Sequence, residues 1–107
     1  MAIHKHHVEV LKKLKTCRAL TQRKAILNKG GKQLQRVLRE IAHNVLRGNV
    51  SLTKKQLKDL KKHRRGVRLI AGKKPTVKRR LKVQQRGGFL SALIAPILTT
   101  LASSILR

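Results

Sequence analysis

The chain of 107 residues contains no Trp and no Tyr, and Phe89 is its only aromatic residue. Aromatic side chains usually dominate the cores of small proteins, so any core here must be aliphatic and thin. A domain of this kind typically holds only about 3–5 kcal/mol of net stability, and a large excess of like charge opposes compaction. The sequence therefore predicts a fold that is marginal alone and becomes firmer when a polyanion neutralises it.

Acidic residues are almost absent. Glu9, Glu40 and Asp59 stand against 28 Lys and Arg residues, which gives a formal net charge of +25. Three scattered carboxylates leave little for paired acid–base chemistry or a divalent-metal site, so we predict no enzyme activity and no cofactor. An ordinary solvated surface mixes charges of both signs. The excess therefore indicates a polyanionic partner, nucleic acid first and an anionic membrane second.

Cysteine is limited to Cys17, so an intramolecular disulfide and an extracellular disulfide scaffold are excluded. Cys17 falls on the apolar stripe of the first predicted helix, which favours burial over nucleophilic work. No pair among the five histidines shares a nearby carboxylate or Cys that would complete a ligand set, and the neighbours His6 and His7 face different ways on a helix. We predict no metal site, and we expect the histidines to add phosphate contacts that gain charge on acidification.

Charge is also absent from Phe89 to Leu106, whereas every Lys and Arg except Arg107 precedes this segment. The change occurs at Gly87-Gly88 and divides the chain into three predicted parts. These are a basic helical module over residues 1–72, a basic arm with the diglycine junction over 73–88, and an apolar tail over 89–107.

Hydrophobic periodicity predicts an all-α fold: a small bundle of three to four short basic amphipathic helices, a basic arm, and a C-terminal apolar helix kinked at Pro96. Two short helices are expected over 6–28, with Thr21 capping the second and Gly30-Gly31 breaking the pattern afterwards. The third helix carries the clearest apolar stripe and ends at Gly48, which suits the left-handed position after a helix.

The fourth helix is predicted to begin at a capping box formed by Thr53 and Gln56. It extends towards Gly72, with Gly66 as a weak point inside it. Residues 76–86 are basic with few apolar positions, so they are expected as a short helix or an extended arm.

The Lys and Arg residues of the predicted helices point away from the apolar stripes. The turn at Gly48-Asn49 suggests a helix-turn-helix, but base reading needs a few positioned donors, whereas Lys and Arg occur throughout this surface. We therefore predict phosphate contacts without base reading, and DNA affinity that falls steeply with salt. The residues predicted to contact nucleic acid are Lys12, Lys13, Arg36, Arg39, Arg47, Lys54, Lys58, Lys61, Lys62, Arg64, Arg65, Arg68, Lys73, Lys74, Lys78, Arg79, Arg80, Lys82 and Arg86.

The apolar tail has three interpretations: it packs on the basic module, it self-associates or binds another protein such as a capsid protein, or it enters a bilayer beside the basic arm. Its eighteen uncharged residues are at the lower limit for a membrane span. Pro96 removes a helical hydrogen bond, so two short helical pieces are expected. The residues predicted for membrane or assembly contact are Phe89, Leu90, Leu93, Ile94, Pro96, Ile97, Leu98, Leu101 and Ile105.

The run Arg86-Gly87-Gly88-Phe89-Leu90-Ser91-Ala92-Leu93-Ile94-Ala95-Pro96-Ile97-Leu98 resembles the end of the adenovirus precursor of the small basic core peptide mu. It is similar to the tails of short basic proteins of Polinton and adintovirus elements. The resemblance implies a late protein of the virion core and host nucleus, bound to genomic double-stranded DNA. It also implies cleavage between Gly88 and Phe89 by a viral cysteine protease, with Gln85 where the family has an aliphatic residue.

An unstructured junction at Gly87-Gly88 would be accessible to such a protease. The alternative is a flexible hinge. Overall, the sequence predicts a non-sequence-specific nucleic-acid-binding protein that neutralises and condenses viral double-stranded DNA in the virion core. Two alternatives are a membrane-active or membrane-anchored peptide precursor whose apolar tail is the working part, and a ribosomal-type RNA-binding protein.

Overall fold

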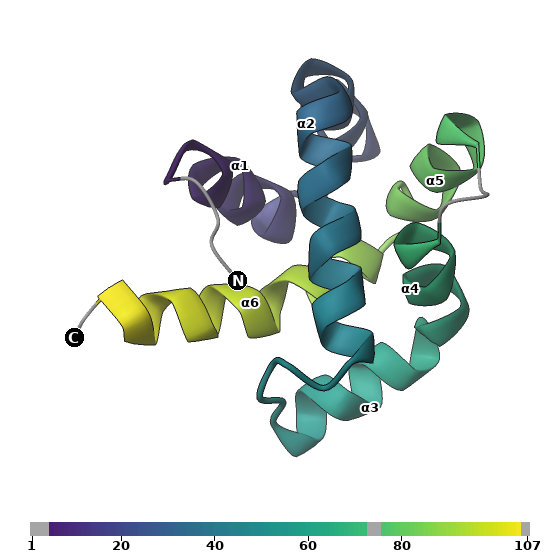
Figure 1. The fold of residues 1–107 in the computed structure, drawn as a ribbon. Coiled ribbons are helices and arrows are strands. Elements are labelled where there is room, and N and C mark those ends of the chain that lie inside the picture. Colours follow the sequence, from purple (N-terminus) through teal and green to yellow (C-terminus); the bar gives the residue numbers. More distant parts are fainter. Residues whose placement is uncertain (1–4, 73–75, 106–107) are drawn as a thin grey trace.

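The computed structural model describes residues 5–72 and 76–105. Within these ranges it describes every side chain except those of residues 5, 77 and 99–105. Every regular element in these ranges is an α-helix, so the predicted all-α class is confirmed. The helices are shown in Figure 1. Their bounds are α1 Lys5–Thr16, α2 Leu20–Leu46, α3 Lys54–Lys62, α4 Arg64–Ala71, α5 Val77–Gln84 and α6 Phe89–Ile105.

The long helix α2 stands at the centre of the molecule, with α1 on one side of it and α4 and α5 on the other (Figure 1). The helix α6 crosses α2 and packs mainly against α1 and α3, while α2 packs mainly against α4. The principal extents are 37 × 27 × 25 Å. Basic helices therefore lie on two opposite sides of α2.

One cluster of buried side chains draws on all six helices, and Phe89 is its single aromatic member. The segments predicted as module, arm and tail all contribute to it, for example through Leu38, Val83 and Leu93. The core is aliphatic, as the composition requires. Its members are Leu11, Leu14, Leu27, Leu34, Leu38, Ile41, Ala42, Val50, Leu60, Val67, Ile70, Ala71, Val83, Phe89, Leu90, Leu93, Ile94 and Ile97.

The apolar tail forms the single helix α6, which continues through Pro96. The prediction of two separate helical pieces is therefore wrong, although Pro96 lies inside the helix as expected. Proline removes one backbone donor but tolerates helical geometry on its own residue, and Pro96 is buried together with its neighbour Ile97. Packing on this chain's own basic helices holds α6 in place.

The boundary between the first two helices differs from the prediction. The break falls at residues 17–19, and α2 begins at Leu20. The residue at the cap position is Ala19, which makes no side-chain capping bond, and Thr21 lies inside the helix, so the prediction that Thr21 caps it is wrong. The helix then runs past Gly30 to Leu46, with a kink at Gly31, where φ is 56° and ψ is −147°. Glycine accepts this non-helical conformation without steric cost, so Gly31 interrupts the helix as the diglycine predicted, and α2 consists of two helical pieces that meet at the kink.

The predicted capping box at the start of α3 is confirmed. The Gln56 backbone N–H donates to Thr53 Oγ1 at 3.1 Å, and the Thr53 N–H donates to Gln56 Oε1 at 3.0 Å. Gly48 has φ 74° and follows α2, also as predicted. The break inside the fourth predicted helix falls at His63, between α3 and α4, while Gly66 lies buried within α4.

Within residues 76–86 the chain forms the helix α5 rather than an extended arm. The Arg79 backbone N–H donates to Thr76 Oγ1 at 3.2 Å and caps the start of α5. After α5 the chain turns through Gly87 and Gly88, where φ is 80°, and enters α6 directly. The predicted unstructured junction is thus an ordered turn.

Candidate nucleic-acid interface

Exposed Lys and Arg side chains occur on or beside all helices except α6. Among the residues predicted to contact nucleic acid, Arg39 and Arg80 are half-buried, and Lys73 and Lys74 lie outside the described residues. The other predicted cations are exposed. They are Lys12, Lys13, Arg36, Arg47, Lys54, Lys58, Lys61, Lys62, Arg64, Arg65, Arg68, Lys78, Arg79, Lys82 and Arg86.

Acidic side chains neutralise very little of this charge. Within residues 5–72 and 76–105 the structure shows one ion pair, between Lys12 Nζ and Glu9 Oε1 at 3.8 Å, and both side chains are about 60% exposed (60% and 62%). Exposed pairs of this kind contribute little to stability. Glu40 is exposed and Asp59 is half-buried. Most of the cationic surface is therefore free to meet an external polyanion.

One polar face of α2 carries a row of three arginines and one histidine. Arg36, Arg39, His43 and Arg47 recur at spacings of three or four residues and line a shallow groove of about 560 Å³. Glu40 is the one acid along this groove. The row follows the axis of the central helix, so it offers consecutive contacts to an extended phosphate backbone.

A second pocket, of about 490 Å³, adjoins this row between α2 and α5. It shares Arg36 and Arg39 with the groove and adds Lys32 and Arg80. Leu27 and Leu81 supply an apolar part of its wall, so the pocket combines a cationic rim with an apolar interior. We call it the α2–α5 pocket.

Two arginines of the α2–α5 pocket are held by the C-terminal end of α4. Arg80 Nη2 donates to Gly72 O at 2.6 Å, and Arg39 Nε makes a longer bond to Ala71 O at 3.5 Å. Carbonyls at a helix C-terminus attract cations because the helix dipole is negative there. The short contact restrains the Arg80 guanidinium, whereas the 3.5 Å contact of Arg39 is at the outer limit of a hydrogen bond and restrains that group weakly.

Arg23 has a structural role that the sequence did not indicate. It is 7% exposed, and its guanidinium donates to Gln85 O at 2.7 Å and to Cys17 O at 3.2 Å. It therefore ties the start of α2 to the turn that precedes α6. Cys17 itself lies after α1 and is half-buried, so its predicted place on the α1 stripe is wrong.

Cations also converge where α3 meets α4. Lys61, Lys62, Arg64, Arg65 and Arg86 line a small pocket of about 200 Å³ there. The start of α4 has no side-chain cap and no acid in its first turn. Uncapped N–H groups beside five cations make this corner of the surface attractive to phosphate oxygens.

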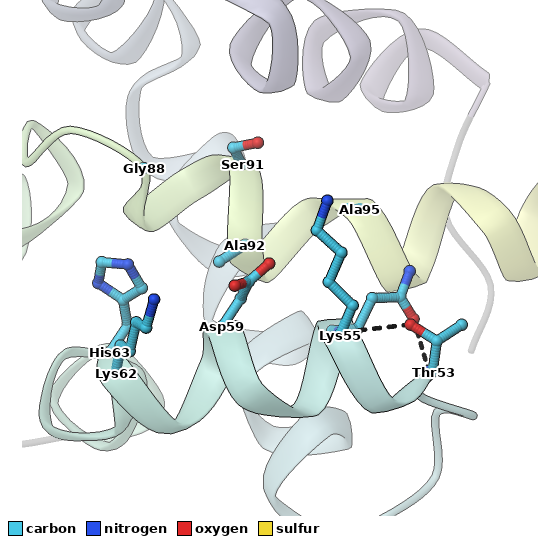
Figure 2. Close-up of a pocket in the computed structure, with 10 residues that line it drawn as sticks. Thr53, Lys55, Asp59, Lys62, His63, Gly88, Ser91, Ala92 and Ala95 are labelled. Atoms are coloured by element: carbon cyan, nitrogen blue, oxygen red, sulfur yellow. Dashed lines mark hydrogen bonds between the residues drawn. The ribbon is translucent and has the colours of Figure 1, made fainter.

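A groove of about 550 Å³ separates α3 from α6, and Figure 2 shows the side chains that line it. Asp59 points from α3 toward Ala92, and His63 lies near the Gly88 turn (Figure 2). The His63 ring meets the Phe89 ring edge to face, with centroids 5.8 Å apart. Among the described residues no hydrogen bond joins Ser91, Asp59 and His63, so this groove has no assembled nucleophile and base.

The residues predicted for membrane or assembly contact are largely internal. Phe89, Leu90, Leu93, Ile94 and Ile97 are at most 2% exposed. Pro96 is buried and Leu98 half-buried. The side chains of Leu101 and Ile105 lie outside the described residues.

The part of the chain that the structure describes lacks two further features. It contains no helix with the length and apolar character needed to cross a membrane. It also contains no group of three His, Cys, Asp or Glu side chains placed to hold a metal ion.

Comparison with known proteins returns no match to a family model, a curated protein or a solved structure.

Proposed function

We propose that this chain is a non-sequence-specific nucleic-acid-binding protein that neutralises and condenses double-stranded DNA. The observation that carries the proposal is the exposure of Lys and Arg side chains around five of the six helices, with one weak ion pair among the described residues. Such a surface gains free energy by releasing counterions from a polyanion, whatever its base sequence.

The net charge of the molecule matches the phosphate charge on a stretch of duplex as long as the molecule itself. Its longest extent is 37 Å, and duplex DNA presents roughly one phosphate charge per 1.7 Å of axis, or about 22 charges over that length. The chain carries a net charge of +25. One molecule therefore holds about as much charge as the stretch of duplex that it spans.

Condensation follows from the distribution of this charge. The helix α1, which carries exposed Lys12 and Lys13, lies on the opposite side of α2 from α5, which carries exposed Lys78 and Lys82 (Figure 1). A duplex bound on one side leaves the cations of the other side free for a second duplex. A molecule of this kind bridges neighbouring duplexes as well as neutralising them.

The biological setting belongs to the same proposal. Residues 86–98 resemble the end of an adenovirus core-protein precursor, which supports a place in the virion core and the host nucleus. Cleavage after Gly88 by a viral cysteine protease also rests on that resemblance and stays a prediction.

Binding to unrelated polyanions tests the proposal directly. Two duplexes of equal length and unrelated sequence, a structured RNA hairpin and anionic vesicles are titrated at one salt concentration. We expect the two duplexes to bind alike, well inside the 10³- to 10⁷-fold gap that separates specific from non-specific sites. A large preference for one duplex or for the hairpin contradicts the proposal, and so does vesicle leakage without DNA binding.

Bridging between two duplexes is tested with two double variants that lose the same charge. Replacing Lys12 and Lys13 with Gln should lower light scattering from condensed DNA more than it lowers affinity for one short duplex, because one of the two binding sides is weakened. The control variant replaces Lys54 and Lys58 with Gln, which removes the same charge from α3 instead of α1. Equal loss of scattering and affinity in the first variant would contradict bridging across α2.

A further inference from the structure

The α2–α5 pocket differs from the rest of the cationic surface because its charged groups are held in place. Arg39 and Arg80 come from different helices, yet consecutive carbonyls at the end of α4, Ala71 O and Gly72 O, accept hydrogen bonds from them. Among the described residues, the exposed arginines of α4 donate no hydrogen bond of this kind. A cation fixed before binding loses less conformational entropy when a ligand arrives.

One donor of this pair lacks an acceptor. Arg80 Nε is buried and has no hydrogen-bond partner among the described residues. A buried donor on a charged group is costly to leave unpaired, and the residue lines the pocket. Phosphate oxygens are the acceptors that match a guanidinium best, because the planar group binds two of them at once.

The pocket is larger than a bare anion requires. Its volume of about 490 Å³ lies within the range of small-molecule sites, roughly 300–1,000 Å³. Half-buried Leu81 forms the accessible apolar part of the wall, since Leu27 is only 1% exposed, and Gly31 leaves the wall without a side chain at the kink of α2. An organic group attached to the phosphate has a surface to lie against.

We propose that the α2–α5 pocket binds one nucleotide unit, with its phosphate on Arg39 and Arg80 and its sugar and base toward Leu81. Lys32 and Arg36 at the rim attract the phosphates on either side along the strand. The inference rests on the proposed function for the choice of a nucleotide over other phosphate esters. It adds a discrete site to a surface that otherwise binds diffusely.

Titration of the full chain with a mononucleotide tests the site without any substitution. Deoxyadenosine 5′-monophosphate and inorganic phosphate are added at constant ionic strength, and the arginine Nε–Hε signals are followed by NMR. We expect the Arg39 and Arg80 signals to move saturably, at about tenfold lower concentration for the nucleotide than for phosphate. The signals of exposed Arg64 and Arg65 should move only slightly and without saturation. Equal behaviour of all four arginines overturns the site.

Substitution gives a second readout. Arg80→Lys keeps the charge but loses the Nε–H and the planar group, so nucleotide affinity should fall about tenfold. Arg79→Lys makes the same chemical change at an exposed neighbour on α5 and should change affinity less than about twofold. Unfolding midpoints of both variants show whether each remains folded. Equal affinities in two folded variants contradict the proposal.

The failure of this site and the failure of the proposed function are distinguishable. If binding of the mononucleotide does not saturate while duplex DNA still binds with steep salt dependence, the pocket proposal is wrong and the proposed function stands. If the mononucleotide saturates while duplex DNA does not bind, the site stands and the coating function is wrong.

Discussion

At the scale of single residues, the fold depends on the contact between Phe89 and Gly66. Phe89 is 1% exposed and is the only aromatic side chain of the protein. It lies directly against α4 because Gly66 has no side chain: a Cβ there would be 2.6 Å from Phe89 Cε2 and 2.9 Å from Val83 Cγ1. The glycine that looks like a weak point in the sequence is the position where α4, α5 and α6 meet.

Gly66→Ala should therefore destabilise the protein, although alanine favours a helix by up to about 1 kcal/mol over glycine. Overpacking a core costs about 1–3 kcal/mol and outweighs that gain. We expect a net loss of about 1–2 kcal/mol in the free energy of unfolding, measured by urea denaturation. Gly87→Ala is the control, because a Cβ at Gly87 meets nothing within 4 Å. Equal stability of the two variants would contradict the contact.

Arg80 shows what sequence reasoning misses at this scale. It was predicted to contact nucleic acid simply as one cation among many. Its bond to Gly72 O, and the bonds of Arg23 to Gln85 O and Cys17 O, join residues that only the fold brings together. Gln35 and Gln84 likewise exchange two amide hydrogen bonds of 2.8 Å across 49 residues. No local pattern encodes contacts at such separations.

At the scale of helices, the ends that were predicted correctly depend on local chemistry. Thr53 with Gln56, and Gly48 with its positive φ, act through neighbouring backbone groups, so the sequence alone identifies them. The interruption of α2 at Gly31 is local in the same way, because glycine adopts its φ of 56° without steric cost, and the diglycine predicted it. The break at His63 was not predicted.

The junction between α5 and α6 makes a prediction about proteolysis. Gly87 and Gly88 are exposed, but Phe89 after the Gly88–Phe89 bond is buried, and a protease groove needs an extended, accessible strand. An adenovirus-type cysteine protease should therefore cut the folded chain more slowly than a peptide of residues 82–95, with products measured by intact mass.

Low concentrations of urea should accelerate this cleavage of the full chain, because cleavage follows the population of locally opened molecules. The peptide serves as the control for direct effects of urea on the protease. Equal cleavage rates for the folded chain and the peptide, without urea, would show that Phe89 is not protected.

At the scale of the whole molecule, a thin aliphatic core opposes a net charge of +25. Burial of about eighteen side chains holds six helices together, while like charges on all sides repel one another. In the proposed function, approaching phosphates relieve the same repulsion that limits stability. The proposal therefore predicts that folding and polyanion binding are coupled through one surface.

Salt should stabilise the protein in the absence of nucleic acid. The Debye length falls from about 30 Å at 0.01 M to about 10 Å at 0.1 M, which is less than the width of the molecule, so repulsion between its sides is screened. We expect the thermal midpoint to rise over this range, measured by circular dichroism. Sodium chloride and sodium acetate should act alike, since screening depends on ionic strength. A falling midpoint would show that attractive ion pairs dominate.

The dependence of duplex DNA affinity on salt tests the central claim most directly. If the exposed Lys and Arg residues bind phosphates by releasing counterions, log K falls linearly with log salt with a slope of about −0.9 per phosphate contacted. For six or more contacts, affinity drops by about 10³-fold or more between 50 and 200 mM salt, equally for two duplexes of unrelated sequence. Affinity that changes little over this range, or that survives for one sequence alone, would contradict the account.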